Sequence, residues 1–78
     1  MAGPVKRSVM IAGHATSITL EPVFWRGLEA AAAAMQLPLN AVVARIDAAR
    51  VAEQTPPNLA SAIRVWLYLR AINDNISQ

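Results

Sequence analysis

The feature that most limits the fold is a short alternating segment that runs straight into a proline. Residues 17–20 read Ser-Ile-Thr-Leu, so in an extended strand Ile18 and Leu20 point to one side and the two hydroxyl side chains to the other. Pro22 follows closely, and a proline at the first position of a helix loses no hydrogen bond. The segment therefore predicts a half-buried strand that leads directly into a helix.

This strand needs a partner, because its backbone N–H and C=O groups have to be hydrogen-bonded. The rest of the chain is mostly helical by pattern, so the most economical partner is the same strand of a second copy, paired antiparallel. Residues 8–11, Ser-Val-Met-Ile, are a second candidate β segment, whose apolar residues have the opposite phase. Gly13 lies between the two segments and permits either a bulge or a turn that folds the first one back. The sequence leaves both arrangements open.

Three helices are predicted after the strand. Their limits are Pro22 to the break at Gln36-Leu37-Pro38, Leu39-Asn40 to the residues before Thr55, and a cap at Asn58 to about Asn73. The third helix is apolar nearly all round, which is typical of a helix in a core or an interface. The domain is expected to span residues 8–73, with a flexible basic arm at 1–7 and a polar tail at 74–78.

Composition favours an oligomer without cofactors. A chain of 78 residues is one small domain, yet 55% of its residues are hydrophobic, more than such a domain buries alone. With no cysteine and one histidine, a disulfide or a Cys/His zinc site within the chain is excluded, and no cofactor is expected. No apolar run approaches the roughly 18 residues that span a bilayer, so we expect a cytoplasmic protein without a membrane partner.

We do not expect an enzyme. His14 is the only candidate acid or base, and no serine, cysteine or carboxylate motif accompanies it, so we interpret it as a turn residue. Trp25 and Trp66 have helical spacing with aliphatic residues, which indicates packing rather than stacking on bases. The net charge of +2 permits nucleic-acid binding but does not require it.

The order of elements resembles the ribbon-helix-helix fold of the Arc and MetJ type of repressor. A narrower resemblance, over roughly residues 6 to 70, is to a small bacterial subfamily with a third helix. The motifs that carry it are Lys6-Arg7-Ser8-Val9, Ile11-Ala12-Gly13-His14, Thr16-Ser17-Ile18, Leu20-Glu21-Pro22, Phe24-Trp25, Ile46-Asp47-Ala48-Ala49-Arg50 and Asn58-Leu59-Ala60-Ser61-Ala62-Ile63-Arg64-Val65. The resemblance implies a mainly α fold in which the N-terminal strand pairs antiparallel with a second chain and a third C-terminal helix is added.

The resemblance also implies a function. Members of the broad family are dimers that insert the paired strands into the major groove of DNA and offer the start of their second helix to the phosphates. By position, base contacts would come from Ala15, Ser17 and Thr19, and phosphate contacts from Asn40 and Ala41. The chemistry agrees, because hydroxyls donate to or accept from base edges and a helix N-terminus favours anions. The basic pair Lys6-Arg7 is either a further phosphate contact or a solubilising arm.

The expected protein is therefore a homodimeric, repressor-like transcription regulator that binds double-stranded DNA. Its predicted dimer core consists of Ile18, Leu20, Phe24, Leu28, Val43 and Ile46. A different hypothesis is a protein-interaction module, such as an adaptor or antitoxin subunit, whose ribbon only joins two subunits while the third helix docks a partner. The lack of a basic side chain on the ribbon motivates it, since Ala15 stands where the family pattern has a long basic residue. On pattern alone, Ser17 and Thr19 are also the ordinary solvent side of a half-buried strand.

Overall fold

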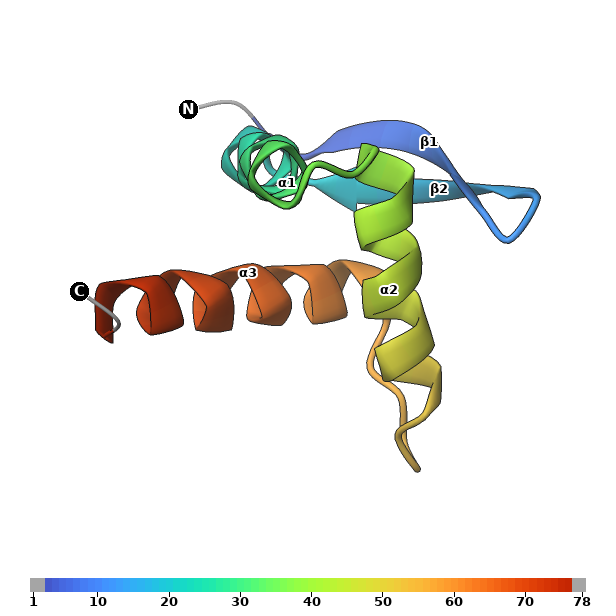
Figure 1. Cartoon of the computed structure of the whole chain (residues 1–78). Helices are drawn as coiled ribbons and strands as arrows, with labels where there is room; N and C mark the ends of the chain where they lie inside the picture. Colours follow the sequence, from blue (N-terminus) through green and yellow to red (C-terminus); the bar gives the residue numbers. More distant parts are fainter. Residues whose placement is uncertain (1–2, 77–78) are drawn as a thin grey trace.

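The computed structural model describes residues 3–76 and contains a two-stranded hairpin followed by three helices (Figure 1). The bounds are Val5–Ile11 for β1, His14–Leu20 for β2, Pro22–Met35 for α1, Leu39–Val51 for α2 and Leu59–Ile76 for α3. In Figure 1, α2 runs down from the hairpin and α3 lies below it. The mainly helical fold with an N-terminal ribbon and a third helix is the one that the sequence predicted.

The partner of the β2 strand is β1 of the same chain. The two strands pair antiparallel, with Ser8 opposite Ser17. Ala12 and Gly13 connect them with φ angles of 50° and 81°, the positive values that a tight two-residue hairpin turn needs. The premise of a lone strand is therefore wrong, because this turn brings residues 5–11 back alongside β2. Pairing with a second copy would use the other edge of β2 and stays a prediction.

The turn explains why the two β segments have opposite phase. Residues directly opposite each other in paired strands share a face, and Val9 lies opposite Thr16. Val9 and Ile11 consequently face the same side as Ile18 and Leu20, and all four are buried, with exposed fractions of 6, 9, 3 and 0%. The register change expected between the segments is achieved by reversing the chain.

Local signals place two helix ends where they were predicted. α1 begins with Glu21 as its N-cap residue and Pro22 in its first turn. It ends at Gln36, whose left-handed φ of 56° lets its backbone N–H bond to the carbonyls of the last turn. Before α3, the Oδ1 atom of Asn58 accepts a hydrogen bond of 2.8 Å from the backbone N–H of Ser61, as expected of an N-cap.

Two boundaries lie elsewhere than predicted. β1 starts at Val5, so residues 5–7, predicted as part of the arm, belong to the strand, where pairing with β2 fixes them. α3 continues to Ile76 instead of ending near Asn73. Asparagine and aspartate reduce helix propensity only modestly, and neither glycine nor proline follows to stop the helix.

The core lies between the inner face of the hairpin and the helices. Its most deeply buried side chains are Leu20, Leu28, Val42, Val43 and Ile63. Of the six residues predicted to form a dimer core, five are buried within a single chain, and Phe24 is half-buried. Their burial needs no second copy, because α3 contributes Ile63 and covers this core.

The apolar surplus that the composition indicated is on the surface. The exposed large apolar residues are Val5, Met10, Val23, Val51, Val65, Tyr68 and Leu69, and the last three belong to α3. None of the described helices is by itself long and apolar enough to cross a membrane. The pair α1 and α2 has the length and composition together, but is bent by 101°.

Candidate nucleic-acid interface

The outer face of the hairpin, the one turned away from the core, is built from three pairs of side chains. The pairs are Lys6 with Thr19, Ser8 with Ser17, and Met10 with Ala15, and all six residues are exposed. The predicted base-contact residues thus form one row along β2. Sequence reasoning missed Ser8 and Met10, which complete the face from β1. Only the strand register reveals them, because their own segment gives no sign of which strand it pairs with.

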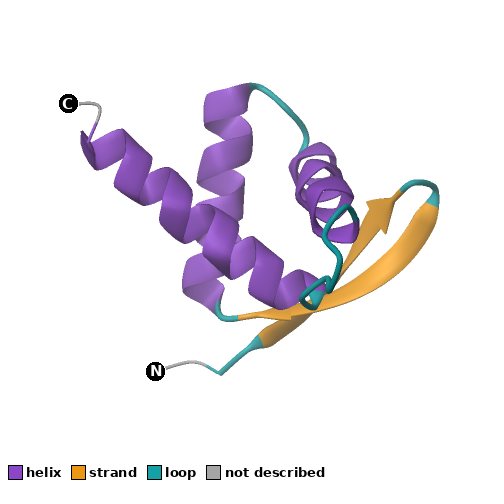
Figure 2. Ribbon diagram, turned by 90° about the horizontal axis from the view of Figure 1, so that it is seen from below, coloured by secondary structure: helices purple, strands orange, loops and turns teal. Residues whose placement is uncertain are grey.

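No other part of the described chain covers the outer face. In Figure 1, α2 and α3 lie below the hairpin, and Figure 2 shows its tip extending beyond the helices. Within residues 3–76, none of the six side chains takes part in a hydrogen bond or an ion pair. The hydroxyl groups in this row are therefore free to exchange hydrogen bonds with an external ligand.

The two basic residues of the N-terminal segment lie on opposite faces. Lys6 is on the outer face beside Thr19 and has no ion pair in the described part of the chain. Arg7 is on the inner side, where its guanidinium lies 4.5 Å from the ring centroid of Trp25 and 3.6 Å from a carboxylate oxygen of Glu29. The positive charge of Arg7 is thus partly balanced within the chain, and Lys6 is the one that accompanies the hydroxyl row.

The start of α2 offers part of the predicted phosphate site. Pro38 is the N-cap residue and provides no side-chain cap. The backbone N–H of Ala41 donates to the carbonyl of Pro38 at 3.0 Å, so it is not free for a ligand. Asn40 is exposed, and neither its backbone N–H nor its side chain is hydrogen-bonded among the described residues. Of the two predicted residues, Asn40 is the one with donors available to an anion.

An ion pair joins the end of the ribbon to α3. The guanidinium of Arg64 donates to both carboxylate oxygens of Glu21, at 3.0 and 3.3 Å. These hydrogen bonds, and secondly one from the backbone of Glu21 itself, hold the pKa of the Glu21 carboxyl below its usual range. The sequence predicted that Arg64 lies at a helix edge or pairs across an interface. The pair is instead within the chain, between residues that are 43 positions apart.

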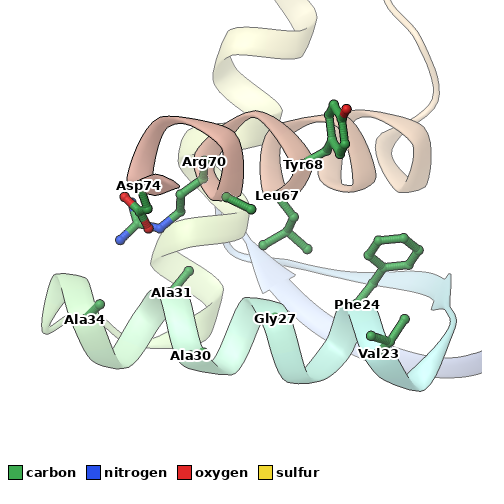
Figure 3. Close-up of a pocket in the computed structure, with 11 residues that line it drawn as sticks. Val23, Phe24, Gly27, Ala30, Ala31, Ala34, Leu67, Tyr68, Arg70 and Asp74 are labelled. Carbon is green, nitrogen blue, oxygen red and sulfur yellow. The ribbon is translucent and has the colours of Figure 1, made fainter. Parts of the chain in front are cut away.

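α3 provides a second, apolar surface. Val65, Tyr68 and Leu69 are 57, 65 and 56% exposed. Between α1 and α3 there is a hollow of about 420 Å³ (Figure 3). Its lining is mostly apolar and includes Val23, Gly27, Ala30, Ala34, Leu67, Tyr68 and Ala71, with Arg70 and Asp74 at one end. A Cβ atom on Gly27 would lie 3.4 Å from Leu67, so the glycine permits the close approach of the two helices.

The described residues offer no constellation for catalysis or for metal binding. His14 is exposed next to the hairpin turn, opposite Ile11, and so is a turn residue as expected. No three side chains of the histidine, cysteine, aspartate or glutamate type within residues 3–76 are placed to hold a metal ion.

Sequence comparison agrees with this geometry. The profile of the ribbon-helix-helix domain matches residues 4–71, which include the hairpin, α1, α2 and most of α3. A search of the curated proteins and a search of the solved structures each gave no match. Ribbon-helix-helix domains are DNA-binding and non-enzymatic. Because the match covers most of its length, this chain belongs to the ribbon-helix-helix domain family.

Proposed function

We propose that this chain is a homodimeric, repressor-like transcription regulator that inserts its β-ribbon into the major groove of DNA in the cytoplasm. The observation that carries the proposal is the outer face of the hairpin, with its free hydroxyls and Lys6. The major groove admits a two-stranded ribbon. The hydroxyls of Ser17 and Thr19 can donate to or accept from base edges there, and Ala15 can contact a thymine methyl group.

Phosphate contacts would position this ribbon. Lys6 lies on the same face as the hydroxyls, and the exposed Asn40 lies at the positive end of the α2 dipole. Arg7 adds a positive charge at the side of the ribbon, weakened by its pairing with Glu29. Each phosphate contact lowers the slope of log affinity against log salt concentration by about 0.9, so binding should be strongly salt-dependent.

Small side chains make few bidentate base contacts, so one protein unit should bind weakly. A homodimer doubles the contacts, and side-by-side dimers on repeated half-sites add more. The sequence predicted that the dimer forms through β2. The free edge of that strand carries alternate N–H and C=O groups that point away from β1, which a second copy can pair with.

Titration of labelled duplexes at increasing salt tests the proposal. Fluorescence anisotropy should show binding at low salt that weakens steeply as salt is added. Thr19→Ala should reduce the affinity while leaving the fold intact, because its side chain makes no internal contact. Thr55→Ala, an exposed threonine before α3, is the matched control and should bind as the unaltered chain does. Absence of binding to any duplex at low salt would refute the proposal.

The exposed apolar residues of α3 favour a second candidate function. In this alternative the ribbon serves only dimerisation, and Val65, Tyr68 and Leu69 dock a partner protein, as in an adaptor or an antitoxin subunit. Isolation of the chain from its own cells would then yield one protein partner in fixed stoichiometry and no nucleic acid. Leu69→Ser should abolish that association, whereas Thr19→Ala should not affect it.

A further inference from the structure

β1 limits what can enter a DNA groove together with β2. Neighbouring strands are about 4.8 Å apart, so the hairpin alone is a narrow two-stranded ribbon. If β2 also paired with β2 of a second copy, the sheet would have four strands, with its outermost strands about 14 Å apart. The major groove is only about 12 Å wide. While β1 is in place, insertion into the groove and pairing along the β2 edge therefore exclude each other.

We propose that the ribbon that reads DNA is formed within one chain, by β1 and β2, and that Ser8 and Met10 of β1 are specificity-determining residues. This rests on the proposed DNA-binding function and deepens it. Ser8 and Met10 lie directly opposite Ser17 and Ala15 on the outer face. Met10 is an apolar side chain that is 52% exposed, and packing against the core does not explain its position.

The order of the pairs along the ribbon indicates which bases each part fits. At the tip, Met10 and Ala15 form an apolar pair, which suits the 5-methyl group of thymine. In the middle, Ser8 and Ser17 present two hydroxyls that accept or donate. At the far end, Lys6 only donates, and so suits the O6 and N7 atoms of guanine. The ligand is therefore a duplex that has thymine under the hairpin tip and guanine toward the start of β1.

Selection from a pool of random duplexes with the full chain supplies the DNA for the test. Ser8→Ala, Met10→Ser and Thr19→Ala are then compared on the selected duplex by fluorescence anisotropy. We expect each to weaken binding about fivefold or more, as the loss of one direct contact does. Val51→Ser is the matched control, because Val51 is apolar and 56% exposed but lies at the far end of α2. Its affinity should be unchanged, and thermal melting should show that every variant is folded.

Replacement of single thymines by deoxyuridine tests Met10 directly, because it removes only the methyl group. At one or more positions, the replacement should weaken binding of the unaltered chain about threefold and should not weaken binding of Met10→Ser further. If Thr19→Ala weakens binding but Ser8→Ala and Met10→Ser do not, β1 lies outside the groove and a ribbon made by two subunits is the reader. That result overturns this inference alone. If no duplex is selected, or Thr19→Ala is also without effect, the proposed function fails with it.

Discussion

The outer face of the hairpin and the exposed side of α3 both face solvent, but they are built in opposite ways. The hairpin buries its apolar residues and presents mainly hydroxyls and a lysine, whereas α3 presents Val65, Tyr68 and Leu69. Polar groups on a ribbon suit a charged and hydrated ligand such as DNA. An apolar helix face suits a protein surface that excludes water. The difference teaches that a DNA surface and a protein surface can occupy separate elements of one small chain.

Two leucines test this contrast with the largest expected effect. Leu20 is completely buried under the hairpin, while Leu69 is 56% exposed on α3. Leu20→Ala should lower the free energy of unfolding by about 2 to 5 kcal/mol through lost packing and the cavity left behind. Leu69→Ala should change it by no more than about 0.5 kcal/mol. Urea unfolding followed by circular dichroism measures both.

A large loss for Leu69→Ala would break the comparison. It would mean that the exposed side of α3 is covered in solution, by a second copy or by another part of the assembly. Repeating the urea titration at several protein concentrations identifies self-association, because the midpoint then rises with concentration.

The start of α3 is the next most sensitive point. Removing the side-chain cap with Asn58→Ala should lower the free energy of unfolding by about 1 kcal/mol, since the backbone N–H of Ser61 then loses its acceptor. Asn40→Ala is the matched control, because the side chain of Asn40 makes no hydrogen bond among the described residues. It should leave stability almost unchanged in thermal melting. Equal losses in the two variants would show that helix propensity, not the cap, determines the effect.

The parts of the fold that the sequence predicted are those fixed by neighbouring residues. The two faces of residues 17–20 follow from alternation, and the starts of α1 and α3 follow from Pro22 and Asn58. The tight turn was left undecided because Ala12 is not a typical residue for a positive φ, so only Gly13 signalled it. The pairs that depend on tertiary packing, such as Arg64 with Glu21, have no local signal at all.

The same consideration applies to the candidate site. Ser17 and Thr19 were predicted because they alternate with buried residues in their own strand. Ser8 and Met10 were missed because their side of the hairpin depends on the register with β2, which the turn sets. The separation of Lys6 from Arg7 also follows from that register. Adjacent residues in a strand point to opposite faces, so the two charges act in different places.

The turn itself offers a change of opposite sign on the hairpin side of the comparison. Ala12 has a φ of 50°, a conformation that costs an alanine free energy but that asparagine tolerates. Ala12→Asn creates the Asn-Gly pair preferred in such turns and should raise the free energy of unfolding by about 0.5 to 1 kcal/mol. Gly13→Ala, at a φ of 81°, should lower it by a similar amount. Thermal melting of the two variants beside the unaltered chain measures the difference, and a stabilising Gly13→Ala would contradict the turn.

The smallest effect is expected where the ribbon and α3 are joined. Hydrogen bonds from Arg64 lower the pKa of Glu21 in the folded chain, so the ionised carboxylate is favoured by folding. Its contribution to stability is therefore fully present above the usual pKa of a glutamate and is lost as the pH falls through the lowered folded value. Both side chains are more than a third exposed, so solvent screens the pair and the contribution is small.

The measurement compares how the melting temperature depends on pH, from neutral to strongly acidic, in three proteins. Glu21→Gln should melt slightly lower than the unaltered chain at neutral pH, and the two should converge in acid. Glu53→Gln is the matched control, because Glu53 is exposed and makes no ion pair within residues 3–76. Its melting curve should follow that of the unaltered chain at every pH. If Glu21→Gln also ran parallel throughout, the bond between the ribbon and α3 would not contribute in solution, and the two surfaces would be independent in stability as well as in chemistry.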